Sequence, residues 1–154
     1  MKTDSRLSVV LHVLLHMAER QKPMTSAELA AHMDTNPVVV RRTMAGLRER
    51  GFVRSEKGHG GGWEIARPLD TITLKDVHDA LGAPALLAIG LHLEHPKCLV
   101  EQAVNRSLTS AFREAEDLLV ARLADVTLAA LAKDFRHHAA LHRAAHKHKD
   151  NNDV

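Results

Sequence analysis

The residues of this chain that are most able to do chemistry are a single cysteine and twelve histidines. Cys98 is the only thiol, which excludes an intramolecular disulfide framework and fits a reducing compartment. An iron–sulfur cluster needs about four protein ligands, most of them thiolates. The side chains that could supplement the thiol are His92, His95 and Glu101. One thiolate falls well short of that set, so we expect no cluster and no other cofactor, and Cys98 remains a candidate redox thiol.

The histidines recur in two places at a spacing of four residues, which puts them on one face of a helix. Near the C-terminus this spacing relates His138, His142 and His146, a pattern that can bind a transition metal ion. No carboxylate or thiolate completes that set, so we interpret it as a solvated helix and predict no metal site. His12 and His16 lie on an N-terminal helix that packing requires, and we interpret them as structural.

The composition is that of a globular, mainly helical protein. Of the 154 residues, 45% are hydrophobic and 26% charged, which argues against disorder. Aromatic residues make up only 3%, so leucine, valine, alanine and methionine must build the core, and these favour helices over a β-sandwich. No nucleophile motif, carboxylate pair or cofactor fingerprint is present, so we expect no enzyme. Nothing predicts a membrane span or a signal peptide, and we expect a cytoplasmic protein.

Charge is distributed unevenly along the chain. Residues 1–67 contain 11 Lys and Arg against 7 Asp and Glu, whereas residues 68–135 contain 6 against 10. A basic first half joined to an acidic middle suggests a polyanion-binding unit attached to a segment that does not touch the polyanion.

The first half has the pattern of a helix-turn-helix. An amphipathic helix ends near Pro23, and Thr25 and Glu28 then form a capping-box pattern that starts a short second helix. Asn36 and Pro37 are an N-cap residue and a first-turn proline, and they begin a third helix that runs to about residue 50. Two helices joined by a short turn, with a helix before them, make this motif.

The third helix has two distinct faces. Its buried stripe is predicted to contain Val40, Met44 and Leu47. The opposite face contains Val38, Arg41, Arg42 and Ala45. Because a helix in the DNA major groove contacts bases from its N-terminal half, the two arginines are candidates for base reading. A solvated surface helix is the alternative that the arginine pair alone leaves open.

A glycine-rich hairpin is predicted directly after this motif. Residues 52–55 and 63–66 have strand patterns, and the stretch GHGGGW at residues 58–63 joins them. A nucleotide-binding loop is excluded because a strand follows the glycines and no Lys-Ser/Thr pair ends the run. A flexible hairpin is one reading of the stretch. A wing whose tip approaches the DNA backbone or minor groove is the other, and the flanking Lys57, His59 and Arg67 favour it.

These segments resemble a known family. Residues 36–53, the run GHGGGWEIARP at 58–68 and ITLKDV at 72–77 are similar to the Rrf-two family of bacterial winged-helix transcription regulators, which includes IscR, NsrR and CymR. The resemblance implies a homodimer on a palindromic operator, with Asn36, Val38, Arg41 and Arg42 facing the bases. The expected backbone and wing contacts are Thr25, Ser26, Arg48, Arg54, Lys57, His59, Gly60 and Gly61. Cys98 matches the first of three cysteines that hold a cluster in some members, and the other two are absent here.

The second half is predicted to dimerise. Thr73 caps a short helix over 74–81, an apolar stretch covers 85–97, and a long helix spans about 100–123. Apolar residues alternate by three and four along that helix: Val104, Leu108, Ala111, Ala115 and Leu118. The spacing alone leaves open an ordinary core-facing stripe, whereas the resemblance implies that this helix forms the dimer interface.

The sequence therefore predicts a mainly α protein with a small two-stranded wing, a winged helix-turn-helix joined to a long dimerisation helix. The expected divisions are a DNA-binding domain (1–82), a linker (83–99), the dimerisation and C-terminal helices (100–148) and a disordered tail (149–154). The predicted function is that of a sequence-specific repressor with double-stranded DNA as its partner, and a small effector or a regulatory protein could supply its signal. The alternative is a degenerate winged helix that binds another protein and no longer reads DNA.

Overall fold

The computed structural model describes residues 5–20, 22–87, 89–91, 93 and 97–150, with side chains to residue 143. Residues 151–154 of the predicted disordered tail lie outside this description, whereas residues 149–150 belong to the last helix. In chain order the elements are α1 (Arg6–Arg20), α2 (Ser26–His32), α3 (Pro37–Glu49), β1 (Val53–Glu56), β2 (Gly62–Ile65), the 3-10 turn η1 (Leu69–Thr71), α4 (Leu74–Ala80), α5 (Leu99–Asp125) and α6 (Leu128–Asp150).

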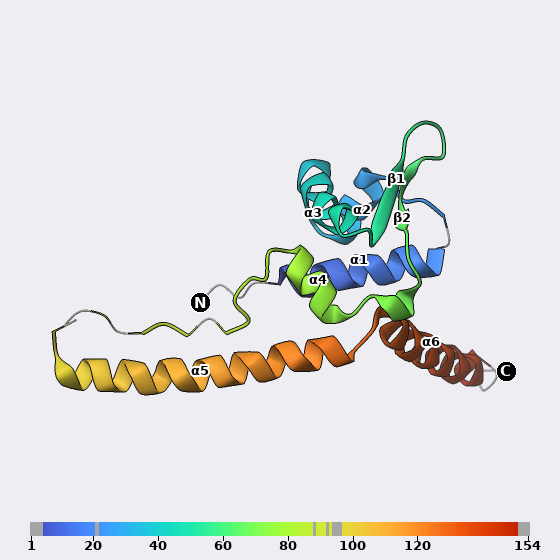
Figure 1. Cartoon of the computed structure of the whole chain (residues 1–154). Helices are drawn as coiled ribbons and strands as arrows, with labels where there is room; N and C mark the ends of the chain where they lie inside the picture. The colour runs from blue at the N-terminus through green and yellow to red at the C-terminus, as the bar shows by residue number, and fades with distance from the viewer. Residues whose placement is uncertain (1–4, 21, 88, 92, 94–96, 151–154) are drawn as a thin grey trace.

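The arrangement confirms the predicted fold class. The α2–α3 pair and the β1–β2 hairpin lie on one side of α1, and α4 and the long α5 lie on the other (Figure 1). The predicted buried stripe of α3 is also confirmed, because Val40, Met44 and Leu47 are fully buried. One continuous core joins this stripe to the inward faces of the other N-terminal elements. Its main contributors from α1 are Val10, Val13, Leu14 and Met17.

Side-chain caps set where the helices of the motif begin. The hydroxyl of Thr25 accepts a hydrogen bond from the Glu28 amide at 3.2 Å, and the Glu28 carboxylate accepts from the Thr25 amide at 2.8 Å, which is the predicted capping box. Hydrogen bonds from Thr25 lower the pKa of Glu28, and Arg20 adds to this effect. Asn36 caps α3 without a reciprocal partner, through its side-chain oxygen alone, and Pro37 occupies the first turn.

The wing is an antiparallel hairpin in which Arg54 lies opposite Glu64 and Ser55 opposite Trp63. Trp63 also makes two backbone hydrogen bonds with Met24, at 2.8 and 2.9 Å, which add the segment before α2 to the edge of β2. The hairpin is therefore attached by its backbone to the start of the helix-turn-helix as well as to its end.

Gly62 and Gly46 are among the glycines that the close approach of other backbone segments requires. A Cβ atom on Gly62 would lie 2.6 Å from the carbonyl oxygen of Met24, and its φ of +155° also disfavours other residues. A Cβ atom on Gly46, in the middle of α3, would lie 2.7 Å from the carbonyl oxygen of Ala80. The absence of side chains at these positions lets the hairpin meet Met24 and lets α3 meet α4.

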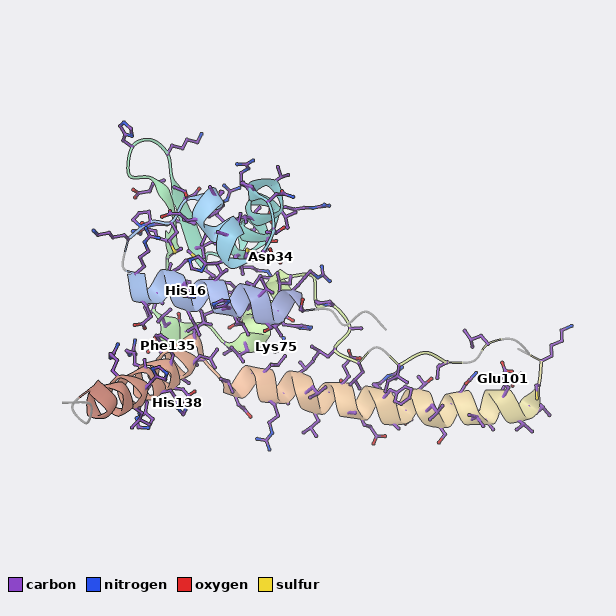
Figure 2. The ribbon with its side chains drawn as sticks, turned by 180° about the vertical axis from the view of Figure 1, so that it is seen from behind. His16, Asp34, Lys75, Glu101, Phe135 and His138 are labelled. Atoms are coloured by element: carbon purple, nitrogen blue, oxygen red, sulfur yellow. The ribbon has the colours of Figure 1, made fainter. Side chains whose placement is uncertain are left out.

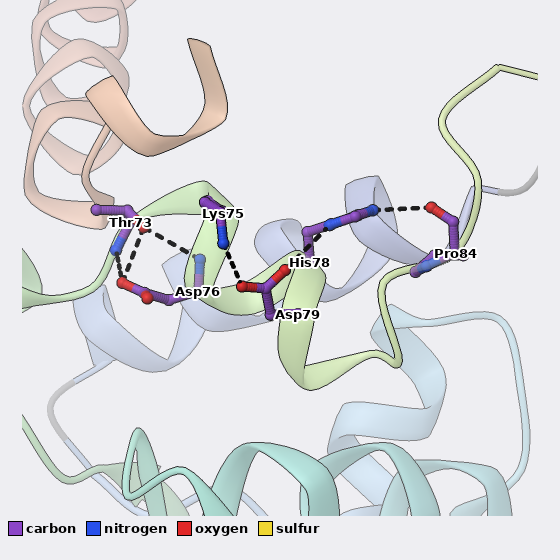
Figure 3. Close-up of polar contacts among 6 residues, drawn as sticks. All are labelled: Thr73, Lys75, Asp76, His78, Asp79 and Pro84. Carbon is purple, nitrogen blue, oxygen red and sulfur yellow. Dashed lines mark hydrogen bonds and ion pairs between the residues drawn. The ribbon is translucent and has the colours of Figure 1, made fainter. Parts of the chain in front are cut away.

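A polar network organises α4 (Figure 3). Thr73 caps the helix as predicted, in a second capping box with Asp76. Lys75 donates to Asp79 at 2.6 Å, and this hydrogen bond lowers the pKa of the Asp79 carboxyl. Nε2 of the buried His78 donates to the Pro84 carbonyl at 2.8 Å. This hydrogen bond attaches the beginning of the segment between α4 and α5 to α4.

The junction between α5 and α6 is paired with the segment that enters α4. The amide of Leu74 donates to the Val126 carbonyl, and the amide of Leu128 donates to the Ile72 carbonyl, both at 2.9 Å. Leu128 and Ala132 are fully buried, and Leu128 belongs to the core of the N-terminal elements. The start of α6 therefore contributes buried residues to the DNA-binding unit predicted over 1–82. The sequence instead predicts this helix as part of a separate C-terminal segment, residues 100–148.

We expect Leu128→Ala to destabilise the N-terminal unit. Removing this buried side chain should lower the free energy of unfolding by about 2–5 kcal/mol, because a cavity would remain between α6 and the core. Urea unfolding followed by circular dichroism measures the change. Leu141→Ala, on an exposed part of α6, is the matched control and should change stability by less than about 0.5 kcal/mol. Equal effects of the two variants would contradict the assignment of α6 to the core.

Candidate nucleic-acid interface

The surface of the molecule opposite α5 consists of α3 and the wing (Figure 1). On α3 the side chain of Val38 is 65% exposed, and Arg41 and Arg42 are also exposed. All three lie in the first half of the helix, whose other face fills the core. The structure thus leaves the predicted DNA-facing side of α3 uncovered by the described residues of this chain.

Asn36 has a structural task at the start of this helix. Its Oδ1 accepts hydrogen bonds from the amides of Val38 and Val39 at 3.0 and 3.1 Å, so the oxygen of the side chain is engaged in the N-cap. Its predicted contact with a base stays a prediction, and such a contact would have to use the side-chain amide nitrogen.

Arg42 faces a groove that sequence periodicity did not predict. The groove has a volume of about 460 Å³ and lies where α1, α3 and α4 meet, with Arg6, Arg42 and Thr43 among its lining residues. Arg6 comes from the first turn of α1, far from α3 in the sequence. No local pattern relates these two arginines, and only the packing of α1 beside α3 brings them to one groove.

Two of the predicted phosphate contacts also hold the motif together. The indole nitrogen of Trp63 donates to the hydroxyl of Ser26 at 3.0 Å, and the guanidinium of Arg48 lies 5.9 Å from the centre of the Trp63 ring. Ser26 belongs to α2, Arg48 to α3 and Trp63 to β2. This contact fixes the two helices and the hairpin relative to one another, and its two polar partners lie at the edge of the candidate interface.

The remaining predicted backbone contacts have different surroundings. Thr25 is engaged in its capping box, and Arg54 forms an ion pair with Glu64 across the hairpin. The hydrogen bond and charge of Glu64 raise the pKa of Arg54, which keeps the guanidinium charged while offsetting part of its positive field. Lys57 and His59 are exposed in the turn between the strands. The projecting end of the wing therefore combines basic side chains with bare backbone at Gly60.

The long helix α5 exposes the predicted apolar seam. None of its 27 residues is buried in the described chain. Val104 is 50% exposed, Leu108 38% and Leu118 62%, and Ala111 and Ala115 are exposed between them. On another side of the same helix Glu116 accepts a hydrogen bond from the Leu86 amide at 2.9 Å. The apolar residues of this seam therefore do not face the core of the described chain, which was the alternative that their spacing had left open.

Cys98 is the N-cap residue of α5, and its thiol is exposed. Glu101 lies half-buried in the first turn of the helix, whereas His92 and His95 lie outside the described residues. This part of the chain supplies one thiolate, which does not fit the ligand set of an iron–sulfur cluster.

The histidines that recur at a spacing of four residues lie on α6 and α1. In α6, His138 lies 3.6 Å from Asp134, and the side chain of His146 lies outside the described residues. In α1, His12 and His16 are exposed and lie away from the core that the helix builds, and their interpretation as structural residues stays a prediction. Burial, followed by the charges of His32 and His12, lowers the pKa of His16. The approach of His32 could not be foreseen, because it belongs to another helix.

Comparison with known proteins places the chain among transcriptional regulators. The Rrf2 family model, described as "Iron-dependent Transcriptional regulator", matches residues 3–134. A relative described as the HTH-type transcriptional regulator YwnA of Bacillus subtilis is 31% identical over 136 residues, which cover 88% of this chain and 97% of that protein. These relatives are regulators and not enzymes.

Solved structures share the fold. A transcriptional regulator from Lactobacillus plantarum aligns with a TM-score of 0.70 at 24% identity, covering 93% of this chain and 97% of that one. CymR, the global cysteine regulator of Bacillus subtilis, aligns with a TM-score of 0.61 at 23% identity, covering 86% and 97%. Within the part of the present chain that the structure describes, no helix is both long and apolar enough to cross a membrane.

Proposed function

The chain belongs to the Rrf2 family of transcriptional regulators, and from this premise we propose that it is a repressor that binds a palindromic operator as a homodimer. The observation that carries the proposal is the uncovered face of α3, where Val38, Arg41 and Arg42 stand exposed beside the wing. The comparisons concern the family. The operator, the dimer and the repression are our inferences from this chain's own surfaces.

In this proposal the first half of α3 enters the major groove. An arginine there can donate two hydrogen bonds to the O6 and N7 atoms of guanine, and an exposed valine offers an apolar contact for a thymine methyl group. The exposure of Arg41 and Val38 supports these roles, because the opposite face of the helix is anchored in the core. Arg42 reaches bases or the adjacent phosphate from the groove that it shares with Arg6.

The wing and the edges of the motif contact the DNA backbone. Lys57 and His59 approach phosphate oxygens or the minor groove, and Gly60 and Gly61 let the backbone of the turn come close. Arg48 on α3 and Arg54 on β1 also contribute, and their charges serve the contacts with Trp63 and Glu64 as well. The basic balance of residues 1–67 supports this placement of the polyanion.

The seam of α5 is covered by the same helix of a second copy. A long helix that leaves its apolar residues exposed is unfavourable in water, and pairing two such helices removes the seam from solvent. A symmetric dimer presents two α3 helices about a two-fold axis, and this axis must coincide with the dyad of the operator. Binding of such a dimer over a promoter would block transcription, which is the basis for proposing a repressor acting in the bacterial cytoplasm.

The regulatory signal enters without an iron–sulfur cluster in this proposal. The ligand count at Cys98 argues for this, and three other routes remain: oxidation of its thiol, a partner protein, or a small effector near residues 83–97. An open groove of about 760 Å³ supports the last route. Leu93 lines one side of it and polar side chains of α5 line the other, among them Arg106, Thr109 and Arg113.

The alternative function is a winged helix that binds a protein and has lost DNA reading. An electrophoretic shift with the DNA upstream of the chain's own gene separates the two functions. A shift that resists excess random DNA supports a regulator that reads sequence. The absence of any shift, with the folded dimer present, would favour the protein-binding alternative.

We expect Arg41→Ala and Lys57→Ala to weaken DNA binding in different ways. Loss of Arg41 should cost about 1–3 kcal/mol on the operator and relax its sequence preference, because a base contact is lost. Loss of Lys57 should weaken binding to operator and random DNA alike and reduce the salt dependence, because a phosphate contact is lost. Titrations of both DNAs at two salt concentrations measure the difference. Equal losses on both DNAs for both variants would refute the division of roles.

We expect Leu108→Asp to disrupt the dimer. The carboxylate would enter the middle of the proposed seam, where desolvation of two facing charges opposes pairing. Analytical ultracentrifugation at micromolar concentration should show a dimer for the unaltered chain and a shift towards monomer for the variant. Leu141→Asp, on the exposed side of α6, is the matched control and should remain dimeric. A monomeric parent chain, or a variant that stays fully dimeric, would contradict the proposal.

We expect the purified protein to be colourless and to bind its operator without iron. The protein is prepared anaerobically with iron and sulfide, and its visible spectrum, iron content and operator binding are compared with those of Cys98→Ser. Both forms should lack a cluster spectrum and should bind the operator equally. A brown protein with stoichiometric iron, whose operator binding is lost in Cys98→Ser, would overturn the ligand-count argument and direct attention to His92, His95 and Glu101.

A further inference from the structure

Two arginines from different helices line one groove beside the uncovered face of α3. The groove lies where α1, α3 and α4 meet, has a volume of about 460 Å³, and includes the exposed residues Arg6 and Arg42. Val39, which is 42% exposed, also lines it, so the groove adjoins the face that we assign to DNA. The first turn of α1 lies near α3, whereas its last turn approaches the wing (Figure 1). The groove and the wing thus lie towards opposite ends of α1.

Small side chains line the part of the groove where α3 meets α4. Gly46 and Ala80 come from these two helices, and their backbones are so close that a Cβ atom on Gly46 would lie 2.7 Å from the Ala80 carbonyl oxygen. Thr43, which follows Arg42 in the sequence, adds a hydroxyl group that can donate a hydrogen bond. The groove therefore combines open space with two guanidinium groups and a hydroxyl donor.

The charge of the groove is positive. None of its described lining residues is acidic, so it holds two guanidinium groups and no carboxylate. An acidic residue lies nearby: Asp34 lines, together with Arg6, a second cavity of about 230 Å³ that does not include Arg42. Figure 2 shows Asp34 over the N-terminal part of α1. One carboxylate can balance only one of the two cations, so the groove keeps an excess positive charge that attracts an anion.

The position of the groove favours a phosphate of the DNA backbone as this anion. A helix in the major groove, which is about 12 Å wide, has a phosphate backbone on either side of it. The wing can reach the backbone on one side, and the groove at the start of α1 is placed to reach the other. A guanidinium group donates paired hydrogen bonds to phosphate oxygens, which makes arginine suited to this contact.

We propose that Arg6 and Arg42 together bind one backbone phosphate in each half-site, on the side of α3 away from the wing. The inference rests on the proposed binding of DNA and adds to it a contact from α1, which the sequence did not connect with the interface. It assigns Arg42 to the backbone and leaves Arg41 as the base-reading arginine of α3. Contacts with the backbone on both sides fix the position of α3 across the major groove.

The experiment uses the full chain, the DNA upstream of its own gene and random DNA of the same length, titrated at two salt concentrations. Arg6→Ala, Arg42→Ala and the double variant are compared with the parent, and Arg6→Lys keeps the charge. The control is Arg136→Ala, which removes the same charge from α6, on the other side of α1 from α3 (Figure 1). All variants should unfold within a few degrees of the parent, since each substituted side chain is exposed.

Arg6→Ala and Arg42→Ala should each weaken binding to both DNAs by about tenfold and reduce the salt dependence, because a charged hydrogen bond to a phosphate is lost. The double variant should lose less than the product of the two single losses, because both arginines hold the same phosphate. Arg6→Lys should keep most of the affinity, since a lysine also binds phosphate. The control should bind both DNAs like the parent.

Ethylation interference on the upstream DNA identifies the phosphate. One position in each half-site should interfere with the parent and not with the double variant. Single losses that multiply in the double variant, or an Arg42→Ala chain that relaxes sequence preference as Arg41→Ala does, would overturn the shared phosphate. Unchanged binding by Arg6→Ala, with a parent that binds the upstream DNA, would overturn the role of α1 and leave the proposed function standing. A parent that binds neither DNA would contradict the proposed function and this inference with it.

Discussion

The arrangement of the candidate interface depends on one residue, Trp63. Its backbone pairs with Met24 on the chain leading into α2, its indole nitrogen donates to Ser26, and its ring lies beneath the guanidinium of Arg48 on α3. Trp63 is 7% exposed, so these contacts form at the boundary between core and solvent. A single large side chain thus connects the hairpin to the segment before α2, to α2 and to α3. The close approach is possible only because Gly62 presents no side chain to Met24.

A second constraint connects the surface of α3 to the distant seam of α5. The pairing of residues 72–74 with 126–128 holds the end of α5 against the start of α4, and Leu128 then enters the core of the N-terminal elements. On the other side, Gly46 lets the backbone of α4 touch α3. Short, packed contacts therefore connect the end of α5 to α4 and, through α4, to α3. In the proposed dimer this connection would set the distance between the two α3 helices, and that distance has to match the spacing of the two half-sites of the operator.

Several cationic side chains at the interface serve the fold and the proposed ligand together. Arg54 is paired with Glu64, and Arg48 lies over Trp63, so their positions are defined before any DNA arrives. Such side chains lose less conformational freedom on binding than free ones, and their charges remain at the surface. Arg41 differs, because it stands on the uncovered face of α3 with freedom to adapt to a base edge. In the proposed mode of binding, Arg48 and Arg54 would position the protein on the DNA backbone, whereas Arg41 would discriminate sequence.

Local patterns in the sequence were sufficient for the order of the helices and strands and for most of their ends to within about two residues, although they did not predict the 3-10 turn η1. The capping box of Thr25, the cap and proline at Asn36 and Pro37, and the amphipathic face of α3 act within a few residues, so the chain carries this information without its tertiary structure. The Rrf2 motif around the wing likewise identified the family. Contacts between residues far apart in the chain followed no such pattern: the burial of Leu128 in the first domain, the shared groove of Arg6 and Arg42, and the meeting of His32 with the histidines of α1. These depend on which helix faces pack together and at what distance, and only the tertiary structure decides that.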